Sequence, residues 1–581
     1  MNIFRLLKNL KWIDYLFIGL VCGLIVLQVW LDLELPVYTR KIMLELAKLQ
    51  GGMEAEMSVI LTNGGYMLAC ALGSLASAIA VGFCTANLSS RLAFNLRNKI
   101  YNKIQGFSLA EINRFSTASL ITRTTNDVTQ VQIFLAIGTQ AIIKAPVLAI
   151  WSVFKILETG WEWSTALAVA IGFLLLMVVI IITVAVPKFK KIQTMTDDIN
   201  RVTDENLNGI RVVRASNAED FQDKKFGVYN DKLTKTQLFV NRVMGIMSPG
   251  MNLLMSGLSL AIYWIGAYIV DDYSKWANMT VFMQYGIQVI AAFMLLIMIF
   301  ILMPRALVSA KRINEVLDTK NSIVSGEFKD FNSNRSASVV FDHVSFKYPD
   351  AEEYVLKDIS FEAKEGETVA FIGSTGSGKS TLINLIPRLY DATEGKVLID
   401  GVDVKDYELE SLNRKIGYVP QRGVLFSGTV KSNINFGDNN ASDETVKEAI
   451  SIAQASNFVS KMGNGVDSRI AQGGTNVSGG QKQRLSIARA VARKPEIFIF
   501  DDSFSALDYK TDKKLRAALK KHTGKVTKFI VAQRIGTIKD ADKIIVLDNG
   551  NMVGMGTHEE LLKKCSVYKE IALSQLSEEE L

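Results

Sequence analysis

The chain has 581 residues, of which 49% are hydrophobic, and its mean hydropathy is +0.20. This length and composition exclude a single compact soluble domain and predict two or three domains. The formal net charge of +7 comes with basic residues that flank apolar segments, a pattern typical of membrane proteins, so we do not expect nucleic-acid binding.

The first half of the chain predicts a transmembrane domain over residues 13–308, preceded by a short basic, amphipathic interfacial helix over 1–12. A helix needs about 20 apolar residues to cross a bilayer. Lys144 interrupts the third span, and it either lines a water-filled path or marks where that helix leaves the membrane. The six expected helices cover about 13–36, 57–87, 130–157, 163–187, 244–270 and 276–304.

Basic residues predict the orientation of these spans. They gather at the N-terminus and in the segments between spans two and three and between spans four and five. The connections on the other side, such as "VDDYSKW", are short and mostly acidic. Both chain ends are therefore expected in the cytoplasm.

Two long polar intervals, 90–127 and 188–242, are rich in helix formers and too long for simple loops. We expect helical extensions into the cytoplasm, which are either plain solvated hairpins or a contact surface for the soluble half. Met244, Met247, Met251 and Met255 share one helical face. This stripe either packs against neighbours or, with the next span's Phe282, Tyr285, Phe293 and Phe300, forms a soft wall around apolar guests.

After the last span the composition changes. Residues 309–337 predict a linker that begins as a charged helix and continues as a Ser/Asn/Gly-rich segment. Residues 338–575 predict a soluble α/β domain, and 576–581 an acidic tail. The stretch "GSTGSGKST" follows an apolar strand and opens a helix, as a phosphate-binding loop does. Its glycines let backbone N–H groups surround phosphates, its lysine reaches the terminal pair, and its serine offers a hydroxyl to Mg²⁺. We therefore expect ATP and Mg²⁺ at Gly373, Ser374, Thr375, Gly376, Ser377, Gly378, Lys379, Ser380 and Thr381.

Three further motifs follow: "YVPQ" ending at Gln421, "VSGGQKQR" over 477–484, and "IFIFDDSFSALD" over 497–508. Their order and spacing resemble an ATP-binding cassette (ABC) domain, and with the six spans the chain resembles a half-transporter of the type IV exporter class. The resemblance implies a multi-domain membrane protein. An all-α six-helix transmembrane domain with long cytoplasmic helical extensions precedes an α/β P-loop (RecA-like) nucleotide-binding domain with a helical subdomain.

The resemblance also implies roles for single residues. Tyr348 stacks on adenine, or is only a core aromatic; Gln421 and Asp501 join Ser380 around Mg²⁺. The signature residues Ser478, Gly479, Gly480 and Gln481 face the γ-phosphate bound by a second cassette, and the "SALD" loop ending at Asp508 connects the two sites.

Two departures from the family pattern fall in the catalytic site. Asp502 stands where the family has a glutamate that aligns water, so the carboxylate is retracted by about 1.5 Å. A misplacement of about 1 Å can cost on the order of 10²-fold in rate. Gln533 stands where the family has a histidine, and none of the three histidines (His343, His522, His558) occupies that place. Glutamine donates a hydrogen bond but cannot carry the charge or take up the proton. Gln472 also replaces a glutamate ahead of the signature, which puts one cross-domain contact in doubt.

These departures predict a subunit that binds ATP and hydrolyses it poorly, and whose signature completes the competent site of a different half-transporter. The expected function is export of hydrophobic, drug- or lipid-like compounds from a bacterial cell, across the plasma membrane. The alternatives are a homodimeric peptide or lipid exporter, and an ATP-gated channel or sensor in which slow hydrolysis times a gate.

Overall fold

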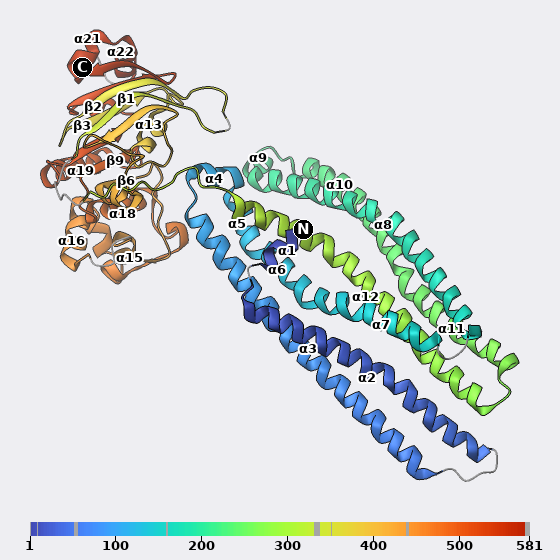
Figure 1. Cartoon of the computed structure of the whole chain (residues 1–581). Helices are drawn as coiled ribbons and strands as arrows, with labels where there is room; N and C mark the ends of the chain where they lie inside the picture. The colour runs from blue at the N-terminus through green and yellow to red at the C-terminus, as the bar shows by residue number, and fades with distance from the viewer. Residues whose placement is uncertain are drawn as a thin grey trace. The chain divides into compact units, whose positions relative to one another are not determined.

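The computed structural model describes residues 2–8, 10–50, 56–157, 161–330, 337–349, 351–436 and 441–575. The chain forms two compact units (Figure 1). The first contains Met1–Lys103 and Ala118–Thr319, and the second contains Ile104–Thr117 and Lys320–Leu581. The predicted acidic tail lies outside the described residues.

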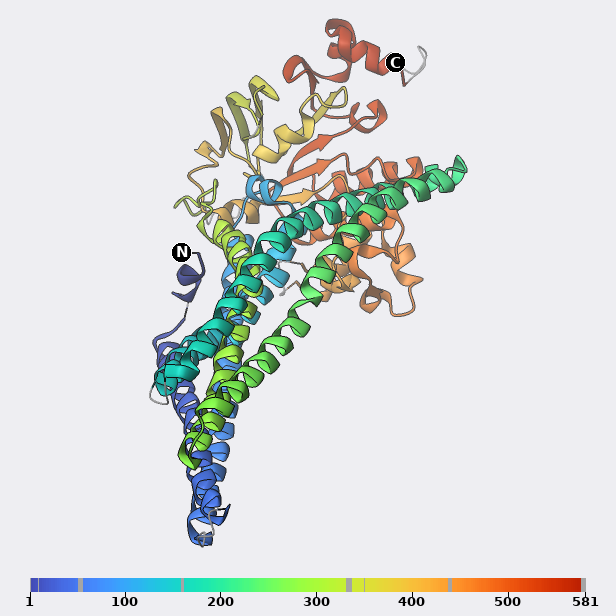
Figure 2. The same cartoon turned by 90° about the vertical axis from the view of Figure 1, so that its right-hand side faces the viewer.

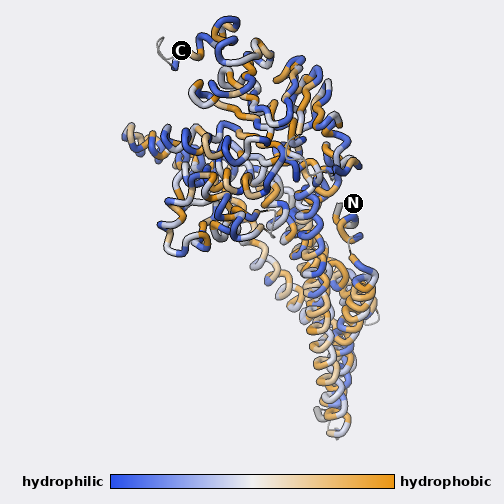
Figure 3. The backbone as a smooth tube through the Cα atoms, turned by 90° about the vertical axis from the view of Figure 1, so that its left-hand side faces the viewer, coloured by the Kyte–Doolittle hydropathy of each residue, from blue (hydrophilic) through white to orange (hydrophobic). Residues whose placement is uncertain are grey.

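The first unit is all-helical, and six of its described segments are long and apolar enough to cross a membrane, as predicted. Apolar residues follow the long helices in Figure 3. The helices are α1 (Asn2–Leu7), α2 (Trp12–Gln50), α3 (Met57–Gln105), α5 (Thr117–Thr122), α6 (Val128–Ile133), α7 (Thr139–Leu157), α8 (Trp161–Asn208), α9 (Ile210–Ala215), α10 (Glu219–Gly245), α11 (Met247–Ile269) and α12 (Tyr273–Asp318), with π-helical turns at Arg123–Asp127 and Phe134–Gly138.

Four of these helices, α2, α3, α8 and α12, run well beyond the expected apolar spans. The polar intervals continue α3 to Gln105 and α8 to Asn208 because these segments are rich in helix formers. Likewise α12 continues to Asp318, ten residues into the segment 309–337 that was expected to be linker. Those ten residues are the charged helix that the sequence predicts ahead of the Ser/Asn/Gly-rich segment.

The core of this unit shows that one residue of the methionine stripe, Met251, packs against other helices of the same chain. Met251, Phe282 and Tyr285 are buried in one apolar cluster with residues of α2, α7 and α8. The helix is interrupted at Ile246. Met244 therefore lies at the end of α10, whereas the other three methionines lie on α11. Packing is therefore the role of Met251, Phe282 and Tyr285 within this chain, and the expected cavity wall does not include them.

The second unit is built around a six-stranded sheet with the order β12-β11-β3-β10-β9-β6, parallel except for β12. A four-stranded antiparallel sheet has the order β2-β1-β4-β5, and β7 pairs with β8. The strands are β1 (Val339–Phe346), β2 (Leu356–Ala363), β3 (Thr368–Gly373), β4 (Glu394–Ile399), β5 (Val402–Asp403), β6 (Ile416–Val419), β7 (Gly428–Thr429), β8 (Arg469–Ile470), β9 (Ile497–Asp501), β10 (Thr527–Val531), β11 (Lys543–Asp548) and β12 (Asn551–Gly556).

Alternating residues of the parallel strands enter two different cores. Phe498 and Phe500 of β9 face one apolar cluster, and Ile497 and Ile499 face the other. Both faces of the sheet are covered, which is why β9 is an unbroken apolar run instead of an alternating one. The helices of this unit are α4 (Leu109–Phe115), α13 (Lys379–Leu385), α14 (Leu409–Lys415), α15 (Val430–Ile434), α16 (Asp443–Ile452), α17 (Ser456–Ser460), α18 (Gly479–Ala492), α19 (Tyr509–His522), α20 (Ile535–Ile538), α21 (His558–Lys564) and α22 (Ser566–Leu573), with 3₁₀ turns at Gly465–Asp467 and Gln472–Gly474.

Helix α4 belongs to this unit although the sequence places it between two membrane spans. Figure 2 shows it, in blue, among the yellow and orange elements. Asn113 donates to the Tyr390 hydroxyl at 3.1 Å, and Leu109 packs against the core of the sheet. Glu111 is buried and accepts hydrogen bonds from the backbone N–H groups of Ser108 (2.8 Å) and Ser322 (3.1 Å). Burial raises the pKa of Glu111, but the hydrogen bonds from Ser108 and Ser322 outweigh it and hold the pKa below its ordinary value.

Candidate nucleotide-binding site

The phosphate loop connects the end of β3 at Gly373 to the start of α13 at Lys379. Gly373 and Gly378 have φ of 156° and 96°, and an added Cβ would lie 2.0 Å from the Leu547 carbonyl oxygen at the first position and 2.7 Å from a Leu356 methyl at the second. Only glycine fits these places. The loop is thereby held against β11 and β2, with its exposed residues Ser374, Thr375 and Gly376 on the open side.

Lys379 lies inside this loop. Its ammonium donates to the carbonyl oxygens of Gly373 (3.0 Å) and Ser374 (2.7 Å), and to the Ser377 hydroxyl (3.3 Å). Burial lowers the pKa of Lys379, and the nearby carboxylates of Asp502 and Asp501 act against this. These acceptors are neutral, so the Lys379 ammonium can leave them and bind a phosphate held by the backbone N–H groups of the loop.

Ser380 and Asp501 are brought together from α13 and the end of β9. The Ser380 hydroxyl donates to Asp501 Oδ1 at 2.7 Å. Burial raises the pKa of Asp501, and the hydrogen bond from Ser380 partly offsets it. A hydroxyl and a carboxylate oxygen are the hard ligands that Mg²⁺ prefers, usually few in number beside phosphate oxygens and water. The pair therefore fits Mg²⁺, which when bound would neutralise phosphate charge, and Gln421 is the neighbouring side chain that could reach it.

The Asp502 carboxylate is held by two glutamines. Gln533 donates its side-chain amide to Asp502 Oδ2 at 2.9 Å, and Gln421 donates to the same oxygen at 3.3 Å. The backbone of Asp502 is left-handed, with φ of 44°, and its N–H donates to the Val531 carbonyl oxygen at 3.0 Å. Burial raises the pKa of Asp502, against the hydrogen bonds from Gln421 and Ser505. The two catalytic-site positions that depart from the family pattern, Asp502 and Gln533, thus contact each other directly.

Tyr348 lies directly after β1 and is half-buried. Its hydroxyl is 2.9 Å from the Thr381 hydroxyl, and its ring packs edge-on against Phe346 and Tyr390. Its bond to Thr381 places Tyr348 next to the helix that follows the phosphate loop. Both predicted roles of this ring, adenine stacking and core packing, remain compatible with that position.

The signature segment caps α18. The Ser478 side chain accepts from the Gln481 N–H, and the Gln481 side chain accepts from the Ser478 N–H at 2.9 Å, a reciprocal capping box. Gly480 lies against the loop before α19, since a Cβ there would be 3.2 Å from the Ala506 carbonyl oxygen. Among the described residues no hydrogen bond joins Ser478–Gln481 to the phosphate loop of this chain. Asp508 ends that loop as the N-cap of α19, accepting from the Thr511 N–H at 2.8 Å.

Two contacts that support the site were not predicted. Gln575 donates to the Gln533 carbonyl oxygen at 2.7 Å and accepts from the Ile535 N–H at 2.9 Å, so the C-terminal segment fixes the backbone of Gln533. Gln483 of α18 donates to the Pro420 carbonyl oxygen at 3.0 Å, which connects the signature helix to the Gln421 loop. A single polar residue at a chain end carries no sequence signal for such a contact.

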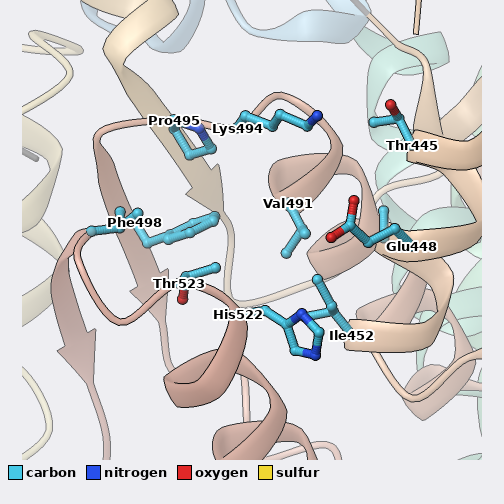
Figure 4. Close-up of a pocket in the computed structure, with 11 residues that line it drawn as sticks. Thr445, Glu448, Ile452, Val491, Lys494, Pro495, Phe498, His522 and Thr523 are labelled. Atoms are coloured by element: carbon cyan, nitrogen blue, oxygen red, sulfur yellow. The ribbon is translucent and has the colours of Figure 1, made fainter. Parts of the chain in front are cut away.

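A separate cavity of about 270 Å³ lies near the amino ends of β9 and β10 (Figure 4). Its lining includes Phe498 near the start of β9, Val526 just before β10, and the side chains of Glu448, Lys494 and His522. The phosphate loop and Asp501 lie instead at the carboxyl ends of β3 and β9. This cavity is therefore not part of the nucleotide site.

The comparisons agree with this arrangement. The family described as "ABC transporter transmembrane region" matches residues 18–301, and the family "ABC transporter" matches residues 356–505. An uncharacterized ABC transporter ATP-binding protein of Mycobacterium bovis is 39% identical over 89% of this chain and 88% of its own length. The ATP-dependent lipid A-core flippase of Syntrophus aciditrophicus is 31% identical over 85% of this chain and 82% of its own.

Among solved structures, a bacterial Atm1-family ABC exporter with ATP bound has the same fold. The TM-score is 0.74 at 23% sequence identity, with 96% of this chain and 99% of that chain covered. The chain has six segments that are long and apolar enough to cross a membrane, a phosphate loop that continues into a helix, and a contact between Ser380 and the buried Asp501 at the end of β9. The chain therefore belongs to the ABC transporters and is an ATPase-coupled membrane transporter with the exporter fold.

Proposed function

We propose that this chain is one subunit of a heterodimeric ABC exporter that moves hydrophobic, drug- or lipid-like compounds out of a bacterial cell. Its own phosphate loop holds ATP and Mg²⁺ and turns ATP over slowly. Its signature segment, Ser478–Gln481, completes a competent site whose phosphate loop belongs to a different half-transporter. Both chain ends lie in the cytoplasm in this proposal.

The observation that carries the proposal is the contact between Gln533 and Asp502 at 2.9 Å. A general base needs a carboxylate oxygen within hydrogen-bond reach of the attacking water. Here the side chain is shorter than glutamate by one C–C bond, about 1.5 Å, and Oδ2 already accepts amide N–H groups from Gln533 and Gln421. An amide donor holds the carboxylate but cannot take up a proton or bear charge.

The groups that bind nucleotide, in contrast, are those of an active ATPase. Ser380 and Asp501 are in contact, and Lys379 lies among the carbonyl oxygens of the loop. The catalytic site has two defects, at Asp502 and Gln533, but the signature is intact. The simplest explanation is that this subunit holds ATP and the partner subunit's site hydrolyses it. The substrate class is inferred from the membrane spans and from the lipid A-core flippase named among the relatives.

The test is the paired substitution Asp502→Glu with Gln533→His in the purified chain. We expect the unaltered chain to bind Mg-ATP but hydrolyse it slowly, and the paired variant to hydrolyse it on the order of 10² times faster. The same two kinds of change at exposed places, Asp540→Glu with Gln193→His, should leave turnover unchanged. Lys379→Ala in the paired variant should abolish the gain. Hydrolysis by the unaltered chain at the rate of the paired variant would contradict the proposal.

The assignment of the partner requires a second measurement. Isolation of the tagged chain from its native membrane should yield a second half-transporter that carries glutamate and histidine at the matching places. Vesicles that contain both subunits should export a hydrophobic dye when ATP is added. Disabling the phosphate loop of the partner should abolish that export, whereas Asp502→Asn in this chain should reduce it only slightly.

A further inference from the structure

Charged side chains lie inside the membrane-spanning helices of this chain. The Lys144 ammonium of α7 is 3.5 Å from Asp32 Oδ2 of α2, and the Lys155 ammonium is 3.5 Å from Glu34 Oε1. With a rise of about 1.5 Å per residue, Lys144 is about 20 Å along the helix from the end of α7 at Leu157. Asp32 is about 30 Å from the start of α2 at Trp12 and about 6 Å from the far end of the expected span 13–36. Ionisable groups within membrane spans are costly and usually serve a function.

Asp32 is held in place by two other helices. Pro36 lies inside α2 and has no N–H, so it cannot donate to the carbonyl oxygen of Asp32 four residues earlier. Gln288 of α12 donates its side-chain amide to that oxygen at 3.3 Å, and Tyr285 donates its hydroxyl to the next carbonyl, of Leu33, at 3.0 Å. The Ser74 hydroxyl of α3 donates to Asp32 Oδ1. Helix α12 therefore holds the backbone of α2 at Asp32, and Ser74 of α3 holds the Asp32 carboxylate.

The cluster retains polar capacity that this chain does not use. A charge-assisted N–H···O bond is usually about 2.7–2.9 Å long, and the Asp32–Lys144 pair is longer, with 27% and 25% of the two side chains exposed. Within the described part of the chain, Gln288 Oε1 and Ser152 Oγ are buried and have no hydrogen-bond partner. Ser152 lies on the same face of α7 as Lys144 and Lys155, eight and three residues away. Buried polar groups without partners are rare and call for an explanation such as a bound polar group.

An apolar hollow lies on the neighbouring face of α7. It has a volume of about 420 Å³ and is lined by Pro146, Val147, Ile150, Trp151 and Phe154. The helix thus carries a charged site and an apolar surface side by side, which is the pattern that an amphiphilic molecule matches.

The charges of the cluster select the kind of amphiphile. Asp32 and Lys144 neutralise each other, so a guest with one charge would pair with one of them and leave the other uncompensated in a medium of low dielectric. A guest with both charges leaves none uncompensated. We propose that the Asp32–Lys144 cluster binds the zwitterionic head group of an amphiphilic substrate, the anionic group at Lys144 and the cationic group at Asp32. This inference rests on the proposed export of hydrophobic compounds and specifies their polar part.

The experiment measures equilibrium binding of radiolabelled lysophosphatidylcholine to the full-length chain in dodecyl maltoside micelles, whose sugar head groups carry no charge. A monoacylglycerol of the same acyl length is the uncharged probe. Lysophosphatidic acid and an alkyltrimethylammonium of the same chain length are the singly charged probes. We expect lysophosphatidylcholine to bind at least tenfold more tightly than either singly charged probe.

Asp32→Asn and Lys144→Met should each weaken binding of lysophosphatidylcholine at least tenfold and change binding of the monoacylglycerol less than twofold. Lys144→Arg, which keeps the charge, should bind within threefold of the unaltered chain. Lys275→Met, which breaks an ion pair with Asp271 in the connection before α12, is the matched control and should bind both probes normally. The swapped variant Asp32→Lys with Lys144→Asp should remain weak, because its polarity is reversed.

Two results would overturn the proposal. The first is binding of lysophosphatidylcholine within twofold of normal by both Asp32→Asn and Lys144→Met. The second is loss of both probes together with recovery of both in the swapped variant, which identifies a structural ion pair. Mg-ATP binding, measured on the same samples, reports the nucleotide site separately, so failure here is distinguishable from failure of the proposed function.

Discussion

Replacement of Lys415 by methionine should destabilise the second unit strongly, and more so at higher pH. The Lys415 ammonium is 2.7 Å from Glu496, 3.0 Å from Asp400 and in contact with Asp330, and its side chain is only 6% exposed. The three carboxylates come from separate parts of the chain, so the lysine joins the residue after β4 (Asp400) and the residue before β9 (Glu496) to the segment before β1 (Asp330). Removal of one partner from a buried ion pair costs about 3–5 kcal/mol.

The sign of the pH dependence follows from the carboxylates. Burial raises the pKa of Glu496 even in the presence of Lys415, whose hydrogen bond and charge act in the opposite direction. Without Lys415 the three carboxylates repel one another, so the pKa of Glu496 rises further in the folded state. The folded variant then binds more protons than the unfolded chain, and its stability increases as pH falls. The deficit of Lys415→Met should therefore be larger at pH 8 than at pH 5.5.

Hydrogen exchange of the β9 amides measures this stability without requiring the membrane unit to unfold. A loss of 3–5 kcal/mol corresponds to exchange faster by about 10²-fold or more. Lys431→Met is the matched control, because its ion pair with Asp443 is exposed (39% and 65%) and is expected to contribute at most about 1 kcal/mol. Exchange in Lys415→Met within tenfold of that control, or a deficit independent of pH, would refute this account of the cluster.

Three other substitutions test separate contacts. Ser380→Ala should weaken Mg-ATP binding more than tenfold and leave binding of ATP in EDTA unchanged, as measured by calorimetry, because it removes the hydroxyl that lies 2.7 Å from Asp501. Glu111→Ala should accelerate hydrogen exchange of the Ser322 amide at least tenfold without affecting ATP binding. Unchanged exchange would show that the hydrogen bond from Ser322 to Glu111 does not fix the segment around Ser322. Burial lowers the pKa of Lys528 from its ordinary value of 10.5 to about 8. Between these two pH values the unfolded chain binds more protons than the folded chain, so the free energy of unfolding should rise with pH by up to about 3 kcal/mol. Lys528→Met should abolish that rise in chemical denaturation measured from pH 7.5 to 10.

The sequence was most informative where chemistry is local. The phosphate loop could be predicted because its function needs glycine, lysine and serine within nine consecutive residues. The strand that ends at Asp501 could be predicted because a strand buried on both faces is uniformly apolar. Gln533 and Asp502 were placed in one site through the family resemblance, and their side chains are in direct contact.

Contacts between distant segments were not predictable in the same way. Lys144 was noticed as a charge in a span, but its partner Asp32 lies 112 residues earlier and depends on how α2 packs beside α7. The methionine face was equally ambiguous, since the spacing of Met251 fits a cavity wall and a core alike, and only its neighbours decide between them. The charged helix after the last span could be predicted from its helix formers, but its end at Asp318 could not, because charged helix formers and linker residues have similar composition.

Helix α4 has a practical consequence for anyone who wishes to work with the soluble half alone. A fragment that starts at residue 320 would contain every motif of the cassette but would lose the seven-residue helix that covers Tyr390 and binds Ser322. Its apolar footprint, where Leu109 and Ala110 sit, would face water. Such a fragment should self-associate through this exposed apolar surface, and a synthetic peptide with the sequence of α4 should prevent the association.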